Sequence, residues 1–590
     1  MQDALLNPSL GGKANSQASD SAYATTLRWA ARIAWLGVVL LLLSQFLINE
    51  RSIPIWDDGL MWQRYDNILL KYGYIGWNAD GIHTYGLTSI LFLIISVPCH
   101  LIFHNNWYHA AILTAFVGTI AFVLGLTTII FRITDASRSF PRLILACLLS
   151  SLYFFFHQHF WELLGSGMDT PFSLLVLSGF LYSSYRMYTE LRSPFKLALW
   201  APALYLTRPD MCMFLAGVGL AFLLGSTKEH RAYAVRFGAY CAGMLAVLGV
   251  GLYLYFHSPV PLPFYAKRHG YYDETFEFYC KQYDDAVWAN FRAEYGWLAI
   301  TAALSAVFLF FKGGSHRWMG ICLVATAGVF TWYISDHVMQ VMGFYGRFYM
   351  PTVIAYVFTI ALAIRYVSRP AKMLIRPQDY KGIGVVAMLG SLFMLGFQLF
   401  SAPSTLERQR VMKFGSGPLG FTFRDGFNEY FIVNGEAVWP SLDVVQKFDG
   451  DVRLASTEAG LPGAWMPNTY FVDTAGLNDT EIALHGLDGA KLLQRNLDVI
   501  YFHGSYPKMN ASILNAPNFW RDYRYYHTRK ERILDVAVRR DYKHFAELDA
   551  AFRKNEDENI VKNYRADQYS DLFYGRVLTD SNDLFQVADE

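Results

Sequence analysis

The chain has 590 residues, of which 53% are hydrophobic and 17% aromatic, and its formal net charge is +1. A net charge this close to zero gives no electrostatic reason to bind nucleic acid. The hydrophobic residues concentrate in long runs within 29–401, whereas 402–590 has the composition of a soluble domain. The composition therefore predicts a membrane domain of several helices followed by a water-exposed domain.

The first apolar run, 29–48, is about as long as the ~20 residues that a membrane helix needs. The polar stretch before it is rich in Ser, Ala and Gly. This stretch predicts a disordered cytoplasmic tail over 1–28 and an uncleaved signal anchor after it. The further candidate membrane helices are 86–103, 107–131, 143–157, 171–187, 197–207, 211–225, 236–256, 297–311, 318–334, 351–368 and 383–401.

The links rich in Lys and Arg set the expected orientation, because such links stay in the cytoplasm. These basic links are 132–142, 186–196, 228–236, 312–317 and 365–381. With the N-terminus also inside, one of the runs 86–103 and 107–131 must fail to span the membrane. The sequence therefore predicts about 11 transmembrane helices. The domain over 402–590 is then extracytoplasmic.

The first outer loop, 49–85, carries two adjacent carboxylates, Asp57 and Asp58, just beyond the first membrane helix. Charge at the membrane boundary is costly and usually serves a function. Either carboxylate could take a proton from an acceptor hydroxyl while its neighbour orients it. The apolar spacing predicts a helix over 60–72 that lies in the interface. Other polar residues of this loop that we expect at the site are Arg64, Asn67 and Asn78.

The second and third outer links also carry charge. Glu162 and Asp169 lie on either side of a glycine-rich turn, and Asp169 is also placed to cap the next helix. Arg208 interrupts an apolar stretch, where an arginine must find an anion or a carbonyl. Asp210, two residues later, is the alternative partner that would give Arg208 a purely structural role.

The last two outer links each place a cation among aromatic residues. Lys267 lies two residues after Tyr265, and Arg347 lies two residues after Tyr345. Long basic side chains also occur at this depth simply because their charged ends reach the water. Together with Arg208, however, these cations predict a phosphate site on the same side of the membrane as the acidic pair.

No spacing typical of metal ligands, no Walker loop and no dinucleotide-binding glycine pattern occurs in the sequence. The sequence therefore assigns no metal ligand and no cofactor, and it leaves a divalent cation open.

The extracytoplasmic domain reads as α/β. Two segments, 451–455 and 497–502, have the β-branched and aromatic content of strands. The segment 477–494 predicts one helix with Asn478 or Asp479 as its cap.

Several short motifs follow one another in a fixed order: Asp57-Asp-Gly, Trp77-Asn, Gly86-Leu-Thr-Ser, Gly167-Met-Asp-Thr, Arg208-Pro-Asp, Phe264-Tyr-Ala-Lys, Tyr345-Gly-Arg-Phe, Ala455-Ser-Thr-Glu-Ala-Gly and Val472-Asp-Thr-Ala-Gly-Leu. This series resembles membrane glycosyltransferases of the GT-C fold, and the bacterial terminal β-1,2-type arabinofuranosyltransferases most of all. The likeness covers most of 29–510. The family usually has Glu where Asp169 stands, and the Phe-, Tyr- and Ile-rich composition departs from its cell-wall members.

The resemblance implies a polyprenyl-phosphate sugar donor, with D-arabinofuranose as the sugar, used at the outer face of a bacterial inner membrane. It also implies that Asp57 and Asp58 are the essential acids. We expect some of Arg208, Lys267 and Arg347 to hold the lipid phosphate, with Tyr265 and Tyr345 in the same donor-binding site. Asp57 is the preferred base. The acceptor would be a glycan or a pilin-like protein, and the stereochemical outcome stays open.

Two other functions are compatible with the sequence. Acidic and basic residues within membranes also mark transport paths, so a transporter or flippase for a lipid-linked substrate is one alternative. An oligosaccharide ligase of the same fold is the other.

Overall fold

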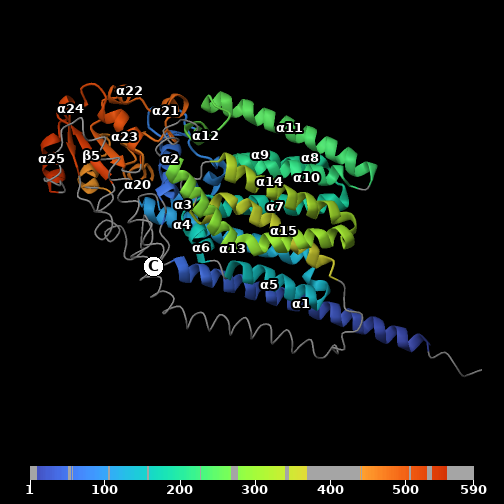
Figure 1. Ribbon diagram of the computed structural model, residues 1–590. Helices are drawn as coiled ribbons and strands as arrows, with labels where there is room; N and C mark the ends of the chain where they lie inside the picture. The colour runs from blue at the N-terminus through green and yellow to red at the C-terminus, as the bar shows by residue number, and fades with distance from the viewer. Residues whose placement is uncertain are drawn as a thin grey trace, which may run out of the picture.

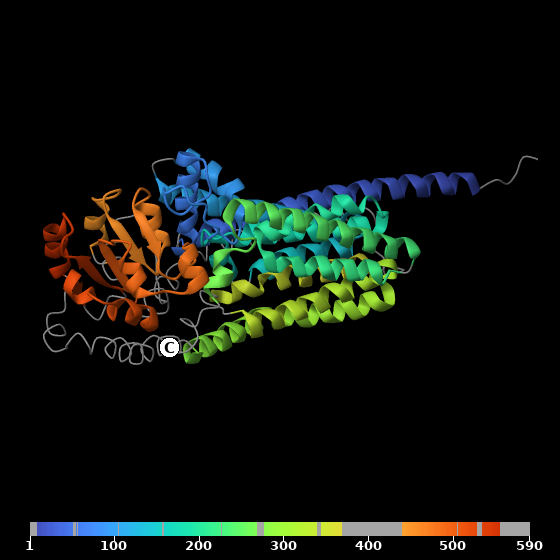
Figure 2. The same cartoon turned by 90° about the horizontal axis from the view of Figure 1, so that it is seen from above.

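The computed structural model describes residues 9–50, 55, 57–103, 106–155, 158–225, 227–267, 277–338, 344–367, 439, 441–503, 506–527 and 534–554. Long helices lie side by side in a bundle, and a small α/β unit covers one end of that bundle (Figures 1 and 2). The N-terminal end of the first helix projects from the opposite end. The predicted span 383–401 lies outside the described residues.

Within the described residues, six helices contain stretches long and apolar enough to cross a membrane. They are α1 (Ser9–Glu50), α4 (Trp107–Ile133), α11 (Lys228–Phe256), α13 (Glu277–Lys312), α14 (Arg317–His337) and α15 (Met350–Arg365), the last together with the end of the 3-10 turn before it, so that the stretch is Gly346–Arg365. The chain is thus a multi-pass membrane protein, and the expected number of about 11 crossings is not confirmed. Apolar side chains on α11 and α13, such as Val247 and Leu304, are exposed, as a lipid-facing surface requires.

Seven further helices of the described residues pack among these six. They are α3 (Leu93–Ile102), α5 (Phe140–Phe155), α6 (Gln158–Gly165), α7 (Thr170–Glu190), α8 (Pro194–Ala198), α9 (Trp200–Thr207) and α10 (Met213–Leu223). The predicted span 86–103 becomes a 3-10 turn, Ile90–Phe92, and the ten-residue α3. Ten helical residues cannot cross a bilayer, whereas the 27 residues of α4 can. The predicted span 197–207 is likewise broken, into α8 and α9.

The expectation of a disordered tail over 1–28 is wrong for the residues after Pro8, because α1 already begins at Ser9. Residues 9–28 contain no proline, and adding residues to an existing helix costs far less than starting one. The helix over 29–48 therefore extends toward the N-terminus.

The α/β unit contains a five-stranded mixed sheet with the order β2-β1-β3-β5-β4. Its strands are β1 (Arg453–Ser456), β2 (Tyr470–Asp473), β3 (Val499–His503), β4 (Tyr523–Tyr526) and β5 (Leu534–Arg539). β1 is parallel to both β2 and β3, and β5 is antiparallel to β3 and β4. The two strands predicted from sequence are confirmed as β1 and β3.

Alternate strand residues build two cores, one on each face of the sheet. Leu454 and Val499 join the core that includes α20 (Gly460–Trp465). Ala455 and Ile500 join the core on the opposite face. That second core is covered by α21 (Thr480–His485), α22 (Gly489–Leu493) and α23 (Pro507–Leu514). The face carrying α20 turns toward the membrane bundle (Figure 1).

The predicted helix over 477–494 is two helices, α21 and α22. Asp479 caps α21 by accepting a hydrogen bond from the Ile482 amide. Of the two caps predicted, Asn478 and Asp479, the second is therefore confirmed. The helix ends at Gly486, which has a φ of 82° that favours glycine. Asp488 then caps α22.

Candidate functional site

The site is organised around α2 (Asp57–Tyr72), the helix that joins the bundle to the α/β unit. The predicted helix over 60–72 is confirmed, and it begins three residues earlier. Leu60, Trp62, Tyr65 and Ile68 are buried, since α2 packs on α3 and α4 on one side and on α20 on the other. The helix is therefore a packed element of the core rather than an exposed interfacial helix.

Arg64 fastens α2 to the α/β unit. Its guanidinium donates to the carbonyls of Trp77, Gly463, Met466 and Thr469 at 2.6 to 3.2 Å. The side chain is 1% exposed and also donates to the Asn78 amide oxygen. Buried charge must be compensated in this way. Arg64 is thus a structural hub, and the prediction that it lines the active cavity is wrong.

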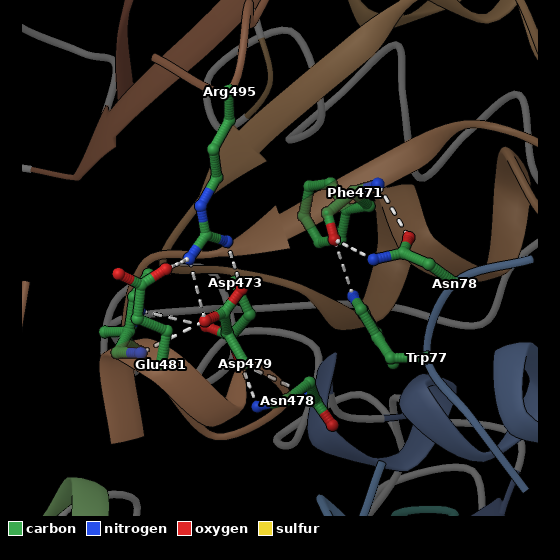
Figure 3. A network of polar contacts seen from close by, with 10 residues as sticks. Trp77, Asn78, Phe471, Asp473, Asn478, Asp479, Glu481 and Arg495 are labelled. Carbon is green, nitrogen blue, oxygen red and sulfur yellow. Dashed lines mark hydrogen bonds and ion pairs between the residues drawn. The ribbon is translucent and has the colours of Figure 1, made fainter. Parts of the chain in front are cut away.

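Asn78 and Trp77 cover the free edge of the sheet at β2. The Asn78 amide accepts from the Phe471 N–H at 2.8 Å and donates to the Phe471 carbonyl at 3.0 Å (Figure 3). The Trp77 indole donates to the same carbonyl at 3.0 Å (Figure 3). An uncovered edge strand would present its unpaired backbone N–H and C=O groups to other chains. Asn78 therefore has a structural role and does not line the cavity.

Asp57 is held by the first turn of α20. Its two carboxylate oxygens accept the N–H groups of Gly460 and Leu461 at 2.8 and 2.7 Å. Only glycine fits at position 460, because a Cβ there would lie 1.7 Å from the Asp57 carbonyl oxygen. Burial raises the pKa of Asp57, and these two N–H groups oppose the rise. Both oxygens are occupied, so the preference for Asp57 as the base is not supported.

Asp58 faces the other way, toward the bundle. Its carboxylate pairs with the Arg347 guanidinium at 3.2 Å, across the interface between α2 and the turn that precedes α15. The Asp58 side chain keeps 20% of its exposure, whereas Arg347 is nearly buried. The two neighbouring aspartates therefore point into different surroundings, Asp57 toward α20 and Asp58 toward the bundle.

A cavity of about 220 Å³ lies beside this ion pair, at the end of the bundle that carries the α/β unit. Arg208, Lys267 and Arg347 all line it. The three cations surround the ring of Phe348, at 5.8, 5.4 and 5.0 Å from its centroid. Residues from three links far apart in the sequence thus converge on one cavity.

Two acids share this cavity with the cations. Asp210 binds Arg208 through two contacts of 2.6 and 3.2 Å, so the structural alternative for Asp210 is confirmed as an ion pair. Asp169 lines the cavity near Arg208 and Arg347 and is 7% exposed. It is the first residue before α7, but its side chain makes no capping hydrogen bond.

Lys267 differs from the two arginines in having no acidic partner. Among the described residues, none forms an ion pair with its ammonium group. Burial, followed by the charge of Arg347, lowers the pKa of Lys267 to about 8. An ammonium group in such surroundings gains from any anion that enters the cavity.

The remaining predicted residues lie elsewhere or are not described. Tyr265 packs with Leu262 and α21 rather than in the cavity, which its neighbour Phe264 lines instead. Asn67 is half-buried on α2 and does not line the cavity. The side chains of Glu162 and Tyr345 lie outside the described residues.

The sequence did not identify several residues of the site. Phe348 and Thr88 line the cavity. Both belong to motifs noted above, but neither was singled out as a site residue. Tyr333 and His337, at the end of α14, also line it, but an aromatic residue at a helix end gives no such signal. Within the described residues, no group of three or more His, Cys, Asp or Glu side chains could hold a metal ion.

No protein-family model matches the sequence, and no curated protein matches it. Among solved structures, the chain is similar to the crystal structure of the Archaeoglobus fulgidus oligosaccharyltransferase in complex with Zn and sulfate. The identity is 10%, the match covers 82% of this chain and 72% of that chain, and the TM-score is 0.44. A likeness at this level carries no argument about the fold or the activity of this protein.

Proposed function

We propose that this protein is a membrane glycosyltransferase of the GT-C type. It transfers a sugar, D-arabinofuranose in this proposal, from a polyprenyl-phosphate donor to a hydroxyl group of an acceptor. The observation that carries the proposal is the convergence of Arg208, Lys267 and Arg347 on one cavity beside Asp58. A cation set next to a carboxylate is what the transfer of a phosphate-linked sugar needs.

The cations serve the donor phosphate. Arg208 and Arg347 are already oriented by Asp210 and Asp58, so little side-chain freedom is lost when the phosphate arrives. Lys267 supplies a further positive charge, and no ion pair to its ammonium group forms within the described residues. When the bond between the anomeric carbon and the phosphate oxygen breaks, these groups stabilise the charge on the leaving polyprenyl phosphate.

Asp58 serves the acceptor. It takes the proton of the acceptor hydroxyl while the hydroxyl oxygen forms its bond to the anomeric carbon. Its ion pair with Arg347 fixes the carboxylate at the edge of the cavity, close to the phosphate-binding groups. A single displacement of this kind inverts the anomeric centre. Asp57, with both oxygens bound to α20, orients its neighbour.

The proposed site faces the outside of a bacterial inner membrane. The α/β unit lies at one end of the bundle and the N-terminal end of α1 at the other (Figure 2). The cavity is lined by residues next to α2, on the side of the α/β unit. The basic links predict that the N-terminal end is cytoplasmic. The α/β unit then borders the acceptor side, where a glycan or a pilin-like protein would approach.

The direct experiment uses the purified full-length protein in lipid nanodiscs, with radiolabelled polyprenyl-phosphate pentose or hexose and a mixture of glycan and peptide acceptors. Formation of labelled acceptor together with free polyprenyl phosphate supports the proposal. In proteoliposomes, movement of the labelled lipid without cleavage of its sugar would support a flippase and contradict the proposal. Transfer of oligosaccharides but not of single sugars would support the ligase.

A further inference from the structure

The turn that carries Asp169 packs closely against the first turn of α2. Gly167 has a φ of 79°, in the region that favours glycine, and a Cβ added at Gly59 would lie 2.7 Å from the Ser166 carbonyl oxygen. Ser173 donates both its N–H and its hydroxyl to the Asp169 carbonyl, at 2.9 and 2.7 Å. The backbone of Asp169 is thus fixed against the helix that carries Asp58.

The Asp169 side chain is only partly satisfied within the described residues. Asp169 is placed to cap α7, but no capping hydrogen bond forms. Its Oδ2 atom is buried and has no hydrogen-bond partner within the described residues. Ser89 lies close enough to favour the ionised carboxyl, yet its own hydroxyl also lacks a hydrogen-bond partner.

A buried polar atom without a partner is costly, by about 1 to 3 kcal/mol for a neutral group and more for a charged one. Such an atom in the wall of a cavity indicates that a ligand group completes it. Burial raises the pKa of Asp169, while Arg208 and Arg347 oppose the rise and favour the carboxylate. The partner that suits a carboxylate beside two guanidinium groups is a neutral hydrogen-bond donor. A second phosphate oxygen would be repelled.

The cavity size limits what that ligand is. Its volume of about 220 Å³ lies below the range of roughly 300 to 1,000 Å³ that is usual for pockets holding drug-sized ligands. A single sugar and its phosphate match this space better than an oligosaccharide does.

We propose that Asp169 recognises the transferred sugar, by accepting a hydrogen bond at Oδ2 from a hydroxyl group of a single sugar bound in this cavity. The inference rests on the proposed function, because it assumes a donor in which a sugar is joined to a phosphate. The cations then bind the phosphate, Asp169 binds the sugar, and Asp58 activates the acceptor. Sugar and phosphate recognition are thereby divided between different side chains.

This division makes the inference testable by binding alone. Full-length protein in nanodiscs is titrated with two lipids, polyprenyl-phosphate pentose and polyprenyl phosphate without a sugar. Asp169→Ala should weaken binding of the sugar-bearing lipid about tenfold or more. Binding of the sugar-free lipid should change less than about threefold, within the range of an indirect effect. The matched control is Asp541→Ala, a substitution at an exposed aspartate of the α/β unit.

Asp169→Asn keeps the shape and one acceptor oxygen, so it carries the test if the alanine variant does not fold. Its loss of affinity for the sugar-bearing lipid should be smaller than that of Asp169→Ala. An equal loss for both lipids, or no loss for either, would overturn the role of Asp169. If the unaltered protein binds neither lipid, the proposed function itself fails.

Discussion

The interface between α2 and the α/β unit and the cavity beside it both contain buried charged groups, but these groups differ in how they are satisfied. In the interface, Arg64 has five hydrogen-bond acceptors and Asp57 has two N–H donors. In the cavity, Lys267 has no ion pair and Asp169 Oδ2 has no partner among the described residues. The satisfied groups stabilise the interface, whereas Lys267 and Asp169 Oδ2 are placed to meet a ligand that enters the cavity.

The two regions meet at adjacent residues, because Asp57 belongs to the interface and Asp58 lies beside the cavity. Asp58→Asn should lower kcat by about 100-fold to 10,000-fold, because a positioned general base contributes that much. The thermal unfolding temperature in detergent should fall only slightly, because the asparagine amide oxygen can still accept a hydrogen bond from Arg347. Radiolabel transfer and a thermal scan of the same preparation measure both effects.

The companion variant Asp57→Asn should show the opposite pattern. Its amide NH₂ would meet the N–H groups of α20, so the interface should lose about 1 to 3 kcal/mol of stability. Transfer per folded molecule should fall only a few-fold. If Asp57→Asn folds normally but has lost transfer, while Asp58→Asn remains active, Asp57 rather than Asp58 is the base.

Arg64 tests the interface on its own. Arg64→Ala leaves four buried carbonyls without their donor, and we expect the interface to lose about 3 kcal/mol or more. Faster proteolytic release of the α/β unit from the bundle would report this loss. Lys71→Ala, on the same helix but exposed, is the control and should change stability by less than about 1 kcal/mol. Equal losses of stability in Arg64→Ala and Lys71→Ala would contradict the structural role of Arg64 at this interface.

Lys267 tests the cavity. Lys267→Ala should reduce kcat/KM for the donor about 10-fold to 100-fold, because a hydrogen bond to a charged group contributes about 1.5 to 3 kcal/mol. Stability should hold or rise, since the variant removes a buried cation that desolvation and the charge of Arg347 disfavour. Lys543→Ala, an exposed lysine of the α/β unit, serves as control. A stability loss without any change in donor use would argue against phosphate binding.

The smallest expected effect is a dependence on pH. The pKa of Lys267 is lowered to about 8, so the ammonium is charged below that pH and becomes neutral above it. Donor kcat/KM should therefore fall as pH rises through about 8, by up to tenfold per pH unit. Lys267→Arg should flatten this fall, because a guanidinium stays charged. A profile that is flat in the original protein would contradict the lowered pKa.

Local features were predictable from the sequence. β1, β3 and the Asp479 cap follow from residues next to one another, and α2 follows from its apolar spacing. The convergence of the three cations was also predictable, because the basic links place all three residues on one side in the predicted topology. These features depend on short-range pattern and on topology alone.

Contacts between distant segments were not predictable. Nothing near Asp57 in the sequence indicates that Gly460 and Leu461, some 400 residues later, bind both of its oxygens. Arg64 looked like a cavity residue for the same reason, because its acceptors lie in the α/β unit. Tyr265 and Phe264 are neighbours on a short helix, and only packing decides which one lines the cavity.

The most direct test is a cryo-EM structure of the full-length protein in nanodiscs with polyprenyl phosphate bound. Phosphate density within hydrogen-bonding distance of Lys267 and at least one of Arg208 and Arg347, with the lipid chain leaving between helices, is the predicted result. Phosphate density at the opposite end of the bundle, or none in this cavity under saturating lipid, would contradict the account.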